Sequence, residues 1–145
     1  LLEYFKNEEA TTGAFSEDGY FLTGDLGVED DEGFFFITGR KKELIIKGGE
    51  NISPREIDDT LYKHNAVLEA CTFGIEDDNY GEEISACVYL KDDLVANEAE
   101  LLDLCKADLG EYKTPRQIIF VDEPLPKGTS VKIQRLKIAS QYRSA

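Results

Sequence analysis

The segment that most constrains the fold is residues 39–57, GRKKELIIKGGENISPREI. A short apolar run, then Gly48-Gly49, then a return run predict a tight β-hairpin. The glycines suit left-handed backbone or the close approach of another group. Ser53, Pro54 and Glu56 then predict the start of a helix, with Ser53 as N-cap, Pro54 as the first helical residue and Glu56 completing a capping box. The chain therefore turns from strand to strand to helix within nineteen residues.

The remaining segments predict an α+β order. The aromatic runs GYFLTGDLG and GFFFITGR flank an acidic turn and predict an earlier hairpin. Later segments predict two strands, a helix capped by Asn97 and ended by Gly110, another strand and a last helix, in AVLEACTFGI, EISACVYL, NEAELLDLCKADLG, RQIIFVD and IQRLKIASQYR. There is no βαβ alternation with phosphate-loop glycines. We therefore expect an α+β fold with a mixed or antiparallel sheet and about three helices, and no Rossmann unit.

Composition excludes several classes of protein. The 41% apolar share, eight Phe and seven Tyr argue against a disordered chain. No apolar run approaches the roughly 20 residues that a membrane span needs. Three cysteines without a CxxC motif indicate neither a disulfide framework nor a zinc site, so we expect buried thiols in a reducing cytoplasm. His64, the single histidine, is expected on a helix face or as a cap, so no Ser–His–Asp or metal constellation is predicted.

The charge is acidic overall but unevenly spread. A net charge of −14 argues against duplex nucleic acid as a partner. Residues 40–50 carry net +2, however, and residues 124–145 hold five basic residues and no acidic one. Two interpretations remain open. The cations are scattered surface residues, or both segments meet a small polyanion such as a nucleotide or a phosphorylated cofactor.

Three side chains are candidates for a site, each with an ordinary alternative. Asp25 follows a glycine at a strand end, where it either forms a turn or accepts the hydroxyls of a ribose. Arg40 is either a surface cation or, opposite Asp25 across the hairpin, a donor to the same sugar or its phosphate. Lys132 lies in a glycine-containing loop, either solvated or placed to meet a developing negative charge. No GxxxxGK[ST] phosphate loop is present.

Three motifs, in the expected order through nearly the whole chain, resemble the C-terminal part of AMP-forming acyl-CoA synthetases. They are GYFLTGDLG, GFFFITGRKKELIIKGGENISPREID and LPKGTSVKIQR. The superfamily is the adenylate-forming enzymes, including coumarate-CoA ligases, luciferases and peptide-synthetase adenylation domains; GGENI followed by P-x-E-I is most similar to the CoA ligases. The resemblance implies that residues 1–40 are the last strands of a large N-terminal domain and that residues 41–145 are the mobile small domain. Without that large domain this chain alone is expected to be inactive.

The resemblance also assigns roles to single residues. Asp25 would hold the ribose hydroxyls of ATP and of the acyl-adenylate, and Arg40 would contact the same ribose and phosphate region. Lys42 would lie at the hinge, near residues 41–42. Lys132 would be the adenylation lysine that bridges the substrate carboxylate and the α-phosphate.

A further implied site concerns CoA. Gly48 and Gly49 would line the channel for its pantetheine arm, with Glu50 beside them. The implied chemistry has two steps, in which a small carboxylic acid and ATP give an acyl-adenylate, and the small domain then rotates so that the CoA thiol attacks. ATP with Mg²⁺, held mainly by the large domain, and CoA are the implied cofactors. The implied location is the cytoplasm.

The sequence departs from the family pattern in two places. Val131 precedes the catalytic lysine where the family usually has glycine, which is expected to stiffen the loop or shift the adenylation geometry. The family's His-Pro before the first strand of the small domain is replaced by HNAV, which is expected to alter only a turn. Two alternatives stay open: an adenylation domain that loads a carrier-protein phosphopantetheine, and a non-catalytic domain that binds a nucleotide or a partner.

Overall fold

A computed structural model describes residues 3–142. By its internal contacts the chain divides into two compact units, Leu1–Lys42 and Glu43–Ala145, which we call unit 1 and unit 2. A short 3-10 turn, η1 (Lys41–Glu43), contains the division. Each unit is described by itself.

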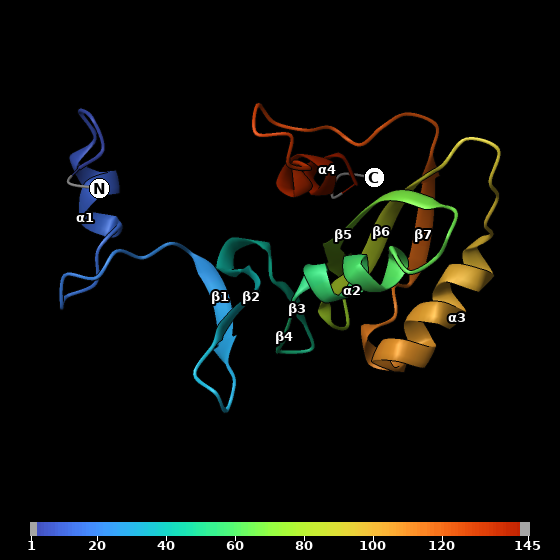
Figure 1. Cartoon of the computed structure of the whole chain (residues 1–145), viewed down its shortest axis with the longest axis horizontal. Coiled ribbons are helices and arrows are strands. Elements are labelled where there is room, and N and C mark those ends of the chain that lie inside the picture. Colours follow the sequence, from blue (N-terminus) through green and yellow to red (C-terminus); the bar gives the residue numbers. More distant parts are fainter. Residues whose placement is uncertain (1–2, 143–145) are drawn as a thin grey trace. The chain divides into compact units, whose positions relative to one another are not determined.

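Unit 1 contains a short helix, α1 (Glu8–Gly13), and a two-stranded antiparallel sheet of β1 (Asp25–Glu29) and β2 (Phe35–Arg40) (Figure 1). The predicted hairpin is present, although its first strand begins later than the aromatic run. Helix α1 was not predicted, because it buries no side chain and so lacks apolar periodicity. Asn7 caps it, accepting a hydrogen bond from the Ala10 amide.

The hairpin of unit 1 exposes an unusual amount of apolar surface. Five large apolar side chains are each more than half exposed, namely those of Val28, Phe34, Phe35, Phe36 and Ile37. An isolated two-stranded hairpin is marginally stable in water, because it has nothing on which to bury such residues. Contiguous exposed apolar residues of this kind are typical of a surface that makes contacts beyond its own unit.

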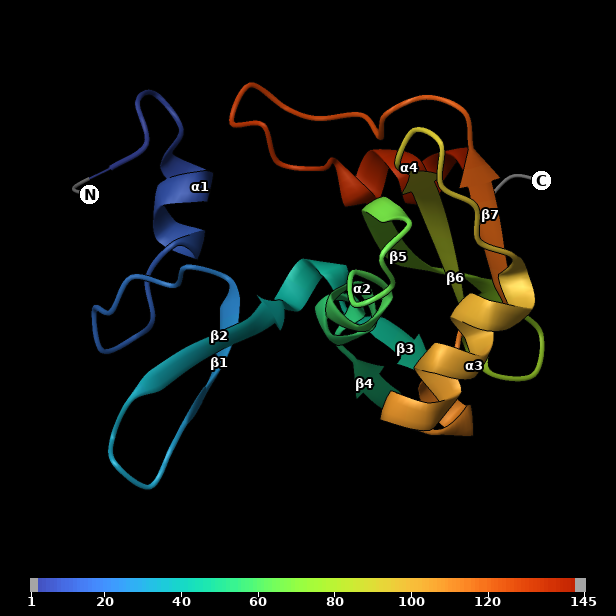
Figure 2. The same cartoon turned by 45° about the vertical axis from the view of Figure 1, so that its right-hand side comes forward.

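Unit 2 is built on a five-stranded mixed sheet. Its strands are β3 (Ile45–Lys47), β4 (Glu50–Ile52), β5 (Val67–Asp77), β6 (Gly81–Leu90) and β7 (Gln117–Val121). Strands β5 and β6 form a long antiparallel hairpin. Strand β6 also pairs with β3 at its first residue and, in parallel, with β7 over its second half (Figure 2).

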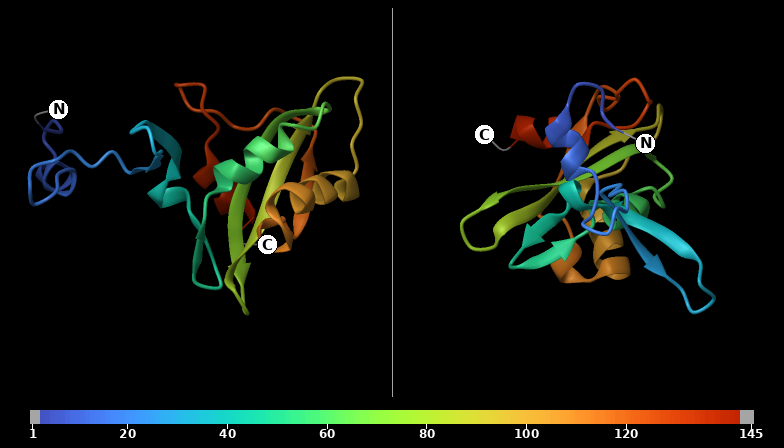
Figure 3. Two further views of the ribbon diagram at one scale, coloured as in Figure 1. Left: turned by 60° about the horizontal axis from the view of Figure 1, so that its bottom comes forward. Right: turned by 90° about the vertical axis from the view of Figure 1, so that its left-hand side faces the viewer.

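Helices cover both faces of this sheet. Helices α2 (Pro54–Leu61) and α3 (Glu98–Leu109) pack on one face and α4 (Arg135–Tyr142) on the other (Figure 3). A second 3-10 turn, η2 (Glu111–Lys113), follows α3. The α+β class, the mixed sheet and the three helices of unit 2 confirm the fold expected from the sequence.

The core alternates along the strands between two clusters. In β6, Ile84, Ala86 and Val88 face α2 and α3, whereas Cys87 faces α4. This follows from the two-residue period of strand side chains. Because both faces are covered, β5 and β6 have nearly continuous apolar sequences and not a simple alternation.

The three thiols are buried and free, as the sequence predicted. Burial disfavours the thiolate and raises the pKa of Cys71 to about 12 and that of Cys105 to about 11. These cysteines therefore act as small core residues and not as nucleophiles.

Helix caps were predicted with mixed success. At α3, Asn97 and Glu100 form the complete capping box, and Gly110 ends the helix at a positive φ of 81°. At α2 the predicted capping box is wrong. Ser53 occupies the N-cap, but its side chain makes no capping hydrogen bond, and Glu56 instead accepts one from Lys113. Glu56 thus forms a tertiary ion pair where a local capping hydrogen bond was predicted.

The placement of His64 also differs from the prediction. It lies in the turn after α2, and not within the helix. There its Nδ1 accepts a hydrogen bond from the Ala66 amide at 3.3 Å. The histidine therefore stabilises the turn that leads into β5.

Arg135, the first residue of α4, ties four elements of unit 2 together. Its guanidinium donates to Glu43 Oε2 at 2.9 Å, to Asp58 Oδ2 at 2.8 Å and to the Thr72 carbonyl at 2.5 Å. Asp58 in turn accepts a hydrogen bond from the Thr72 amide at 2.7 Å. Burial alone would lower the pKa of Arg135, but the facing Asp58 carboxylate acts together with Cys71 and Glu43 to outweigh this and raise it. The arginine and its partners therefore form a buried, charged junction of η1, α2, β5 and α4.

We expect Arg135→Met to lower the free energy of unfolding by about 3–5 kcal/mol, because Asp58 is left buried without its cation. Urea unfolding measures the loss. Arg55→Met is the matched control, since Arg55 forms an exposed pair with Asp59 at 3.8 Å and its removal should cost less than about 1 kcal/mol. Equal losses in the two variants would mean that the buried junction contributes nothing specific.

Candidate functional site

Asp25 and Arg40 face each other where the unit 1 hairpin opens. They are paired residues in the β1–β2 register, and Arg40 Nε lies 3.0 Å from Asp25 Oδ1. The side chain of Asp25 is 26% exposed and that of Arg40 is 57% exposed, so both are reachable from solvent. A carboxylate has more acceptor sites than this one contact uses. The pair is thus able to offer acceptors and donors to one polar ligand.

Gly48 and Gly49 form the two-residue turn between β3 and β4, with Lys47 paired to Glu50 across it. Their φ values are +57° and +86°, the left-handed backbone that the sequence predicted for this turn. A Cβ on Gly49 would meet no atom within 4 Å, so bare backbone faces open space there. A Cβ on Gly48 would lie 2.8 Å from the Tyr112 hydroxyl.

Lys132 lies in a small hairpin-like loop between β7 and α4. Val131 N donates to the Gly128 carbonyl and Gly128 N to the Lys132 carbonyl, both at 2.9 Å. The lysine side chain is exposed. Val131 has φ +60°, a left-handed conformation that is a genuine outlier for a β-branched residue. The loop therefore keeps a backbone suited to glycine while carrying valine.

The structure does not bring all the predicted residues together. The Gly48-Gly49 turn and the Lys132 loop both belong to unit 2 but lie at different ends of it (Figures 1 and 2). Asp25 and Arg40 belong to unit 1, and Lys42 is an exposed residue in the 3-10 turn at the division.

Four of the eight described cations in the two basic segments are paired within their own units. Arg40, Lys47, Lys127 and Arg135 each form an ion pair with a carboxylate. The net charge of the two segments therefore overestimates the number of cations that are available to bind a polyanion. Lys132 is a more specific candidate, because it is an exposed cation on a shaped loop.

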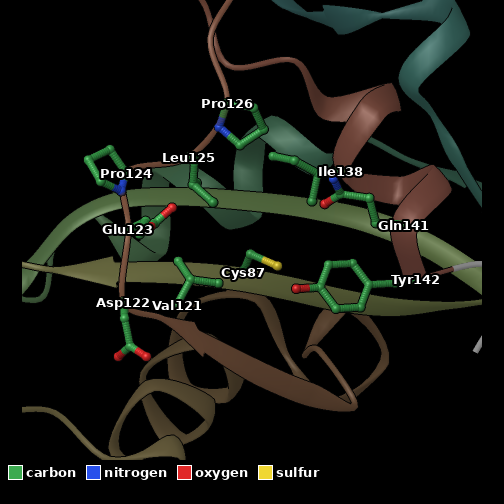
Figure 4. Close-up of a pocket in the computed structure, with 10 residues that line it drawn as sticks. All are labelled: Cys87, Val121, Asp122, Glu123, Pro124, Leu125, Pro126, Ile138, Gln141 and Tyr142. Carbon is green, nitrogen blue, oxygen red and sulfur yellow. The ribbon is translucent and has the colours of Figure 1, made fainter.

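Two cavities open on the surface of unit 2. One, of about 410 Å³, lies between α4 and the segment after β7 and is lined by residues such as Cys87, Leu125 and Tyr142 (Figure 4). None of the predicted site residues lines it. The other, of about 510 Å³, is lined by Lys47, Tyr112 and their neighbours, next to the glycine turn.

The sequence did not lead us to the residues that support the glycine turn and the Lys132 loop, namely Lys47, Tyr112 and Arg135. A signal for Lys47 exists, because the strand period places it on the same face as the buried Ile45. Arg135 also leaves a signal, since a cation in the first turn of a helix opposes the helix dipole and so implies another role. Tyr112 carries no local signal. Its contacts depend on a segment 65 positions away.

Some kinds of site are absent from residues 3–142. They contain no group of three or more His, Cys, Asp or Glu side chains placed to hold a metal ion. No helix among them is long and apolar enough to cross a membrane.

Comparison with known proteins gives one consistent family. Residues 56–132 match the family described as AMP-binding enzyme C-terminal domain. The chain is 50% identical to sulfoacetate–CoA ligase of Cupriavidus necator, over 93% of this chain and 26% of that protein. It is 45% identical to 2-succinylbenzoate–CoA ligase of Bacillus pumilus, over 95% and 28%.

Solved structures agree with the fold. ATP-bound MatB from Rhodopseudomonas palustris superposes with a TM-score of 0.88 at 34% identity, covering 97% of this chain and 28% of that one. The o-succinylbenzoate CoA synthetase of Bacillus subtilis, in complex with its acyl-adenylate, gives 0.84 at 40% identity, covering 94% and 27%. The chain spans about a quarter of the length of the curated relatives that it matches. It belongs to the family of AMP-binding enzyme C-terminal domains, in the adenylate-forming superfamily.

Proposed function

We propose that this chain is the C-terminal part of an ATP-dependent, AMP-forming carboxylate–CoA ligase. The observation that carries the proposal is 50% identity over 93% of the chain to a protein named as a CoA ligase. The activity belongs to a longer protein, because this chain corresponds to about a quarter of such relatives. The relatives' names favour CoA over a carrier protein as the acceptor, and favour catalysis over a purely binding role.

Within that enzyme, residues 1–40 are the end of a large domain and residues 41–145 are a mobile small domain, with Lys42 at the hinge. The division of contacts after Lys42 supports this boundary. The exposed apolar hairpin of unit 1 supports it too, since the rest of a large domain would cover those side chains. Hinges are commonly a few residues between elements that absorb the change in φ and ψ.

Asp25 and Arg40 bind the nucleotide. The Asp25 carboxylate accepts the ribose hydroxyls, and the Arg40 guanidinium, held 3.0 Å from it, orients that carboxylate and contacts the ribose and phosphate region. Mg²⁺ accompanies ATP as part of the substrate. We assign the ion no ligand in this chain, because residues 3–142 contain no carboxylate and imidazole cluster suited to it.

Lys132 serves the first half-reaction. A carboxylate oxygen of the substrate attacks the α-phosphorus of ATP, a P–O bond forms, and the bond to pyrophosphate breaks. Negative charge accumulates on the oxygens of the α-phosphate as this happens. The Lys132 ammonium supplies a positive charge between the carboxylate and those oxygens, which lowers the barrier by electrostatic stabilisation.

The Gly48-Gly49 turn serves the second half-reaction, in which the CoA sulfur attacks the acyl carbonyl carbon and AMP leaves. Glycine backbone without side chains allows the thin pantetheine arm to pass closely, and Glu50 lies beside that path. Because this turn and Lys132 lie at different ends of one compact unit, a single orientation cannot present both to the same reacting atoms. Rotation of unit 2 between the half-reactions follows from that separation.

Location in the cytoplasm stays a prediction. Among the relatives, the medium-chain acyl-CoA ligases of mammals are named as mitochondrial. The identity of the activated carboxylic acid is to be determined by experiment, so ATP–pyrophosphate exchange is measured with a panel of carboxylic acids.

The first test compares the full-length enzyme with its Lys132→Ala variant. We expect ATP–pyrophosphate exchange to fall at least about 100-fold, because the transition-state charge loses its cation. Thioester formation from pre-made acyl-adenylate and CoA should change less than about threefold. No exchange by the wild type with any acid of the panel would contradict the proposed function. Robust exchange that is indifferent to Lys132 would contradict only the role of this lysine.

Gly49→Leu in the same enzyme should block thioester formation and spare adenylation. A Cβ at this position would meet no atom of the folded chain within 4 Å, so we expect the leucine side chain to project into the space proposed for pantetheine. It also strains a residue at φ +86°, by about 1–3 kcal/mol. Gly110→Leu, at φ +81° and equally unobstructed, controls for this strain. Equal loss of both half-reactions in Gly49→Leu would indicate a folding defect and not a CoA channel.

Val131→Gly should stabilise the Lys132 loop. Relief of the left-handed valine is worth about 1–3 kcal/mol, and the added freedom of glycine in the unfolded chain costs about 0.4–1 kcal/mol, so we expect a net gain of about 1 kcal/mol in urea unfolding. Val95→Gly is the control, since Val95 is another exposed loop valine but not at positive φ, and its loss should be destabilising. A destabilised Val131→Gly would show that valine contributes contacts that outweigh its strain.

A further inference from the structure

We propose that Lys47 and Tyr112 are positioning residues that fix the Gly48-Gly49 turn for the transfer of the acyl group to CoA. This inference rests on the function proposed above and adds two residues to which the family resemblance assigned no role. It starts from a buried charged cluster that the chemistry described so far does not use.

Lys47 is a buried cation whose ammonium group is held by partners from unit 2. It is 7% exposed, and its Nζ lies 2.5 Å from Glu83 Oε1 and 3.1 Å from the Tyr112 carbonyl. The same ammonium lies 5.0 Å from the ring centre of Tyr112 and 5.5 Å from that of Tyr80. A buried ammonium held by a carboxylate, a carbonyl and two aromatic faces is fixed in place, and it cannot also serve as a mobile donor to a ligand.

The partners of Lys47 also hold the backbone of the turn. The Tyr112 hydroxyl donates to the Lys47 carbonyl at 2.6 Å, immediately before Gly48. The Gly48 amide donates to the Tyr80 carbonyl at 2.8 Å. The turn is therefore attached to η2 on one side and to the β5–β6 hairpin on the other, while Gly49 remains open.

These contacts restrict a turn that its two glycines would otherwise leave flexible. Two adjacent glycines have many accessible conformations, so a free Gly-Gly turn would present its backbone in many positions. Reacting groups need placement to within a fraction of an ångström, and misplacement by about 1 Å can cost 100-fold in rate. A buried anchor at Lys47 and a hydrogen bond from Tyr112 restrict the turn without adding any side chain to the open side.

The cluster should act on one half-reaction only. Lys47 and Tyr112 contact η2, β3 and β6, whereas the Lys132 loop is held by its own turn and by Arg135 in α4. A loosened glycine turn therefore leaves the adenylation lysine in place. This selectivity separates a positioning role from a general contribution to folding, which would affect both half-reactions.

The main test is Tyr112→Phe in the full-length enzyme, which removes one oxygen atom and its bond to the Lys47 carbonyl. We expect kcat/KM for CoA, measured with pre-made acyl-adenylate, to fall about tenfold, with ATP–pyrophosphate exchange unchanged within twofold. Tyr62→Phe is the matched control. Tyr62 is also a partly exposed tyrosine whose hydroxyl bonds backbone, at Ala70, but it lies away from the turn, and both rates should stay at the wild-type level.

A second set of variants tests the buried pair. Lys47→Met alone leaves Glu83 buried without its cation and risks misfolding, so the double variant Lys47→Met/Glu83→Gln is used. It should lose CoA transfer selectively, and Lys47→Arg, which keeps the charge, should restore part of it. Lys106→Met, which removes an exposed lysine lining the same cavity, is the control and should change neither rate.

The inference is overturned if Tyr112→Phe and the double variant transfer to CoA at the wild-type rate, or if they lose exchange and transfer equally. Wild-type enzyme without exchange on any acid would instead defeat the proposed function. That outcome is read from the wild-type enzyme alone, before any variant is compared with it, so the two failures are distinguishable.

Discussion

The guanidinium of Arg135, whose side chain is only 14% exposed, makes the contacts on which the architecture of unit 2 depends most. One planar side chain bonds η1, α2 and β5 from the start of α4, with contacts to Glu43, Asp58 and the Thr72 carbonyl. A buried ion is tolerated only if each of its neighbours is in place, which makes such a junction sensitive to the position of all four elements. It also fixes the end of the Lys132 loop, because α4 begins three residues after that lysine.

The Gly48-Gly49 turn and the Lys132 loop of unit 2 both contain residues at positive φ, reached by different means. Gly48 and Gly49 adopt positive φ without steric cost, so their turn is unstrained but intrinsically loose. The buried contacts of Lys47 and Tyr112 compensate for that looseness. Val131 adopts positive φ against its own preference, so its loop is strained but intrinsically restricted. The glycine turn therefore depends on its neighbours because it is loose, whereas the Lys132 loop depends on its surroundings to offset the strain of Val131.

Local features were predictable from the sequence, and long-range ones were not. The α3 N-cap and the glycine turn depend on residues within a few positions of each other, and both were predicted correctly. At α2 the Ser53 side chain makes no capping hydrogen bond, and Glu56 pairs with Lys113, 57 positions away. The Arg135–Glu43 contact spans 92 positions. Helix α1 was not predicted, because a helix that buries no side chain leaves no periodic pattern of apolar residues in the sequence.

The placement of the two clusters bears on the proposed movement of the small domain. Both the Arg135 junction and the Lys47 cluster lie inside unit 2, where they hold α4 and the glycine turn against neighbouring elements. If one turn serves adenylation and the other serves thioester formation, the exchange between them must be a rotation of the whole unit. The backbone change then falls on the residues at the division, where Lys42 is exposed and Glu43 is already fixed by Arg135. The Arg135 contact thus sets the inner limit of the proposed hinge, because flexing beyond Glu43 would break the ion pair between Glu43 and Arg135.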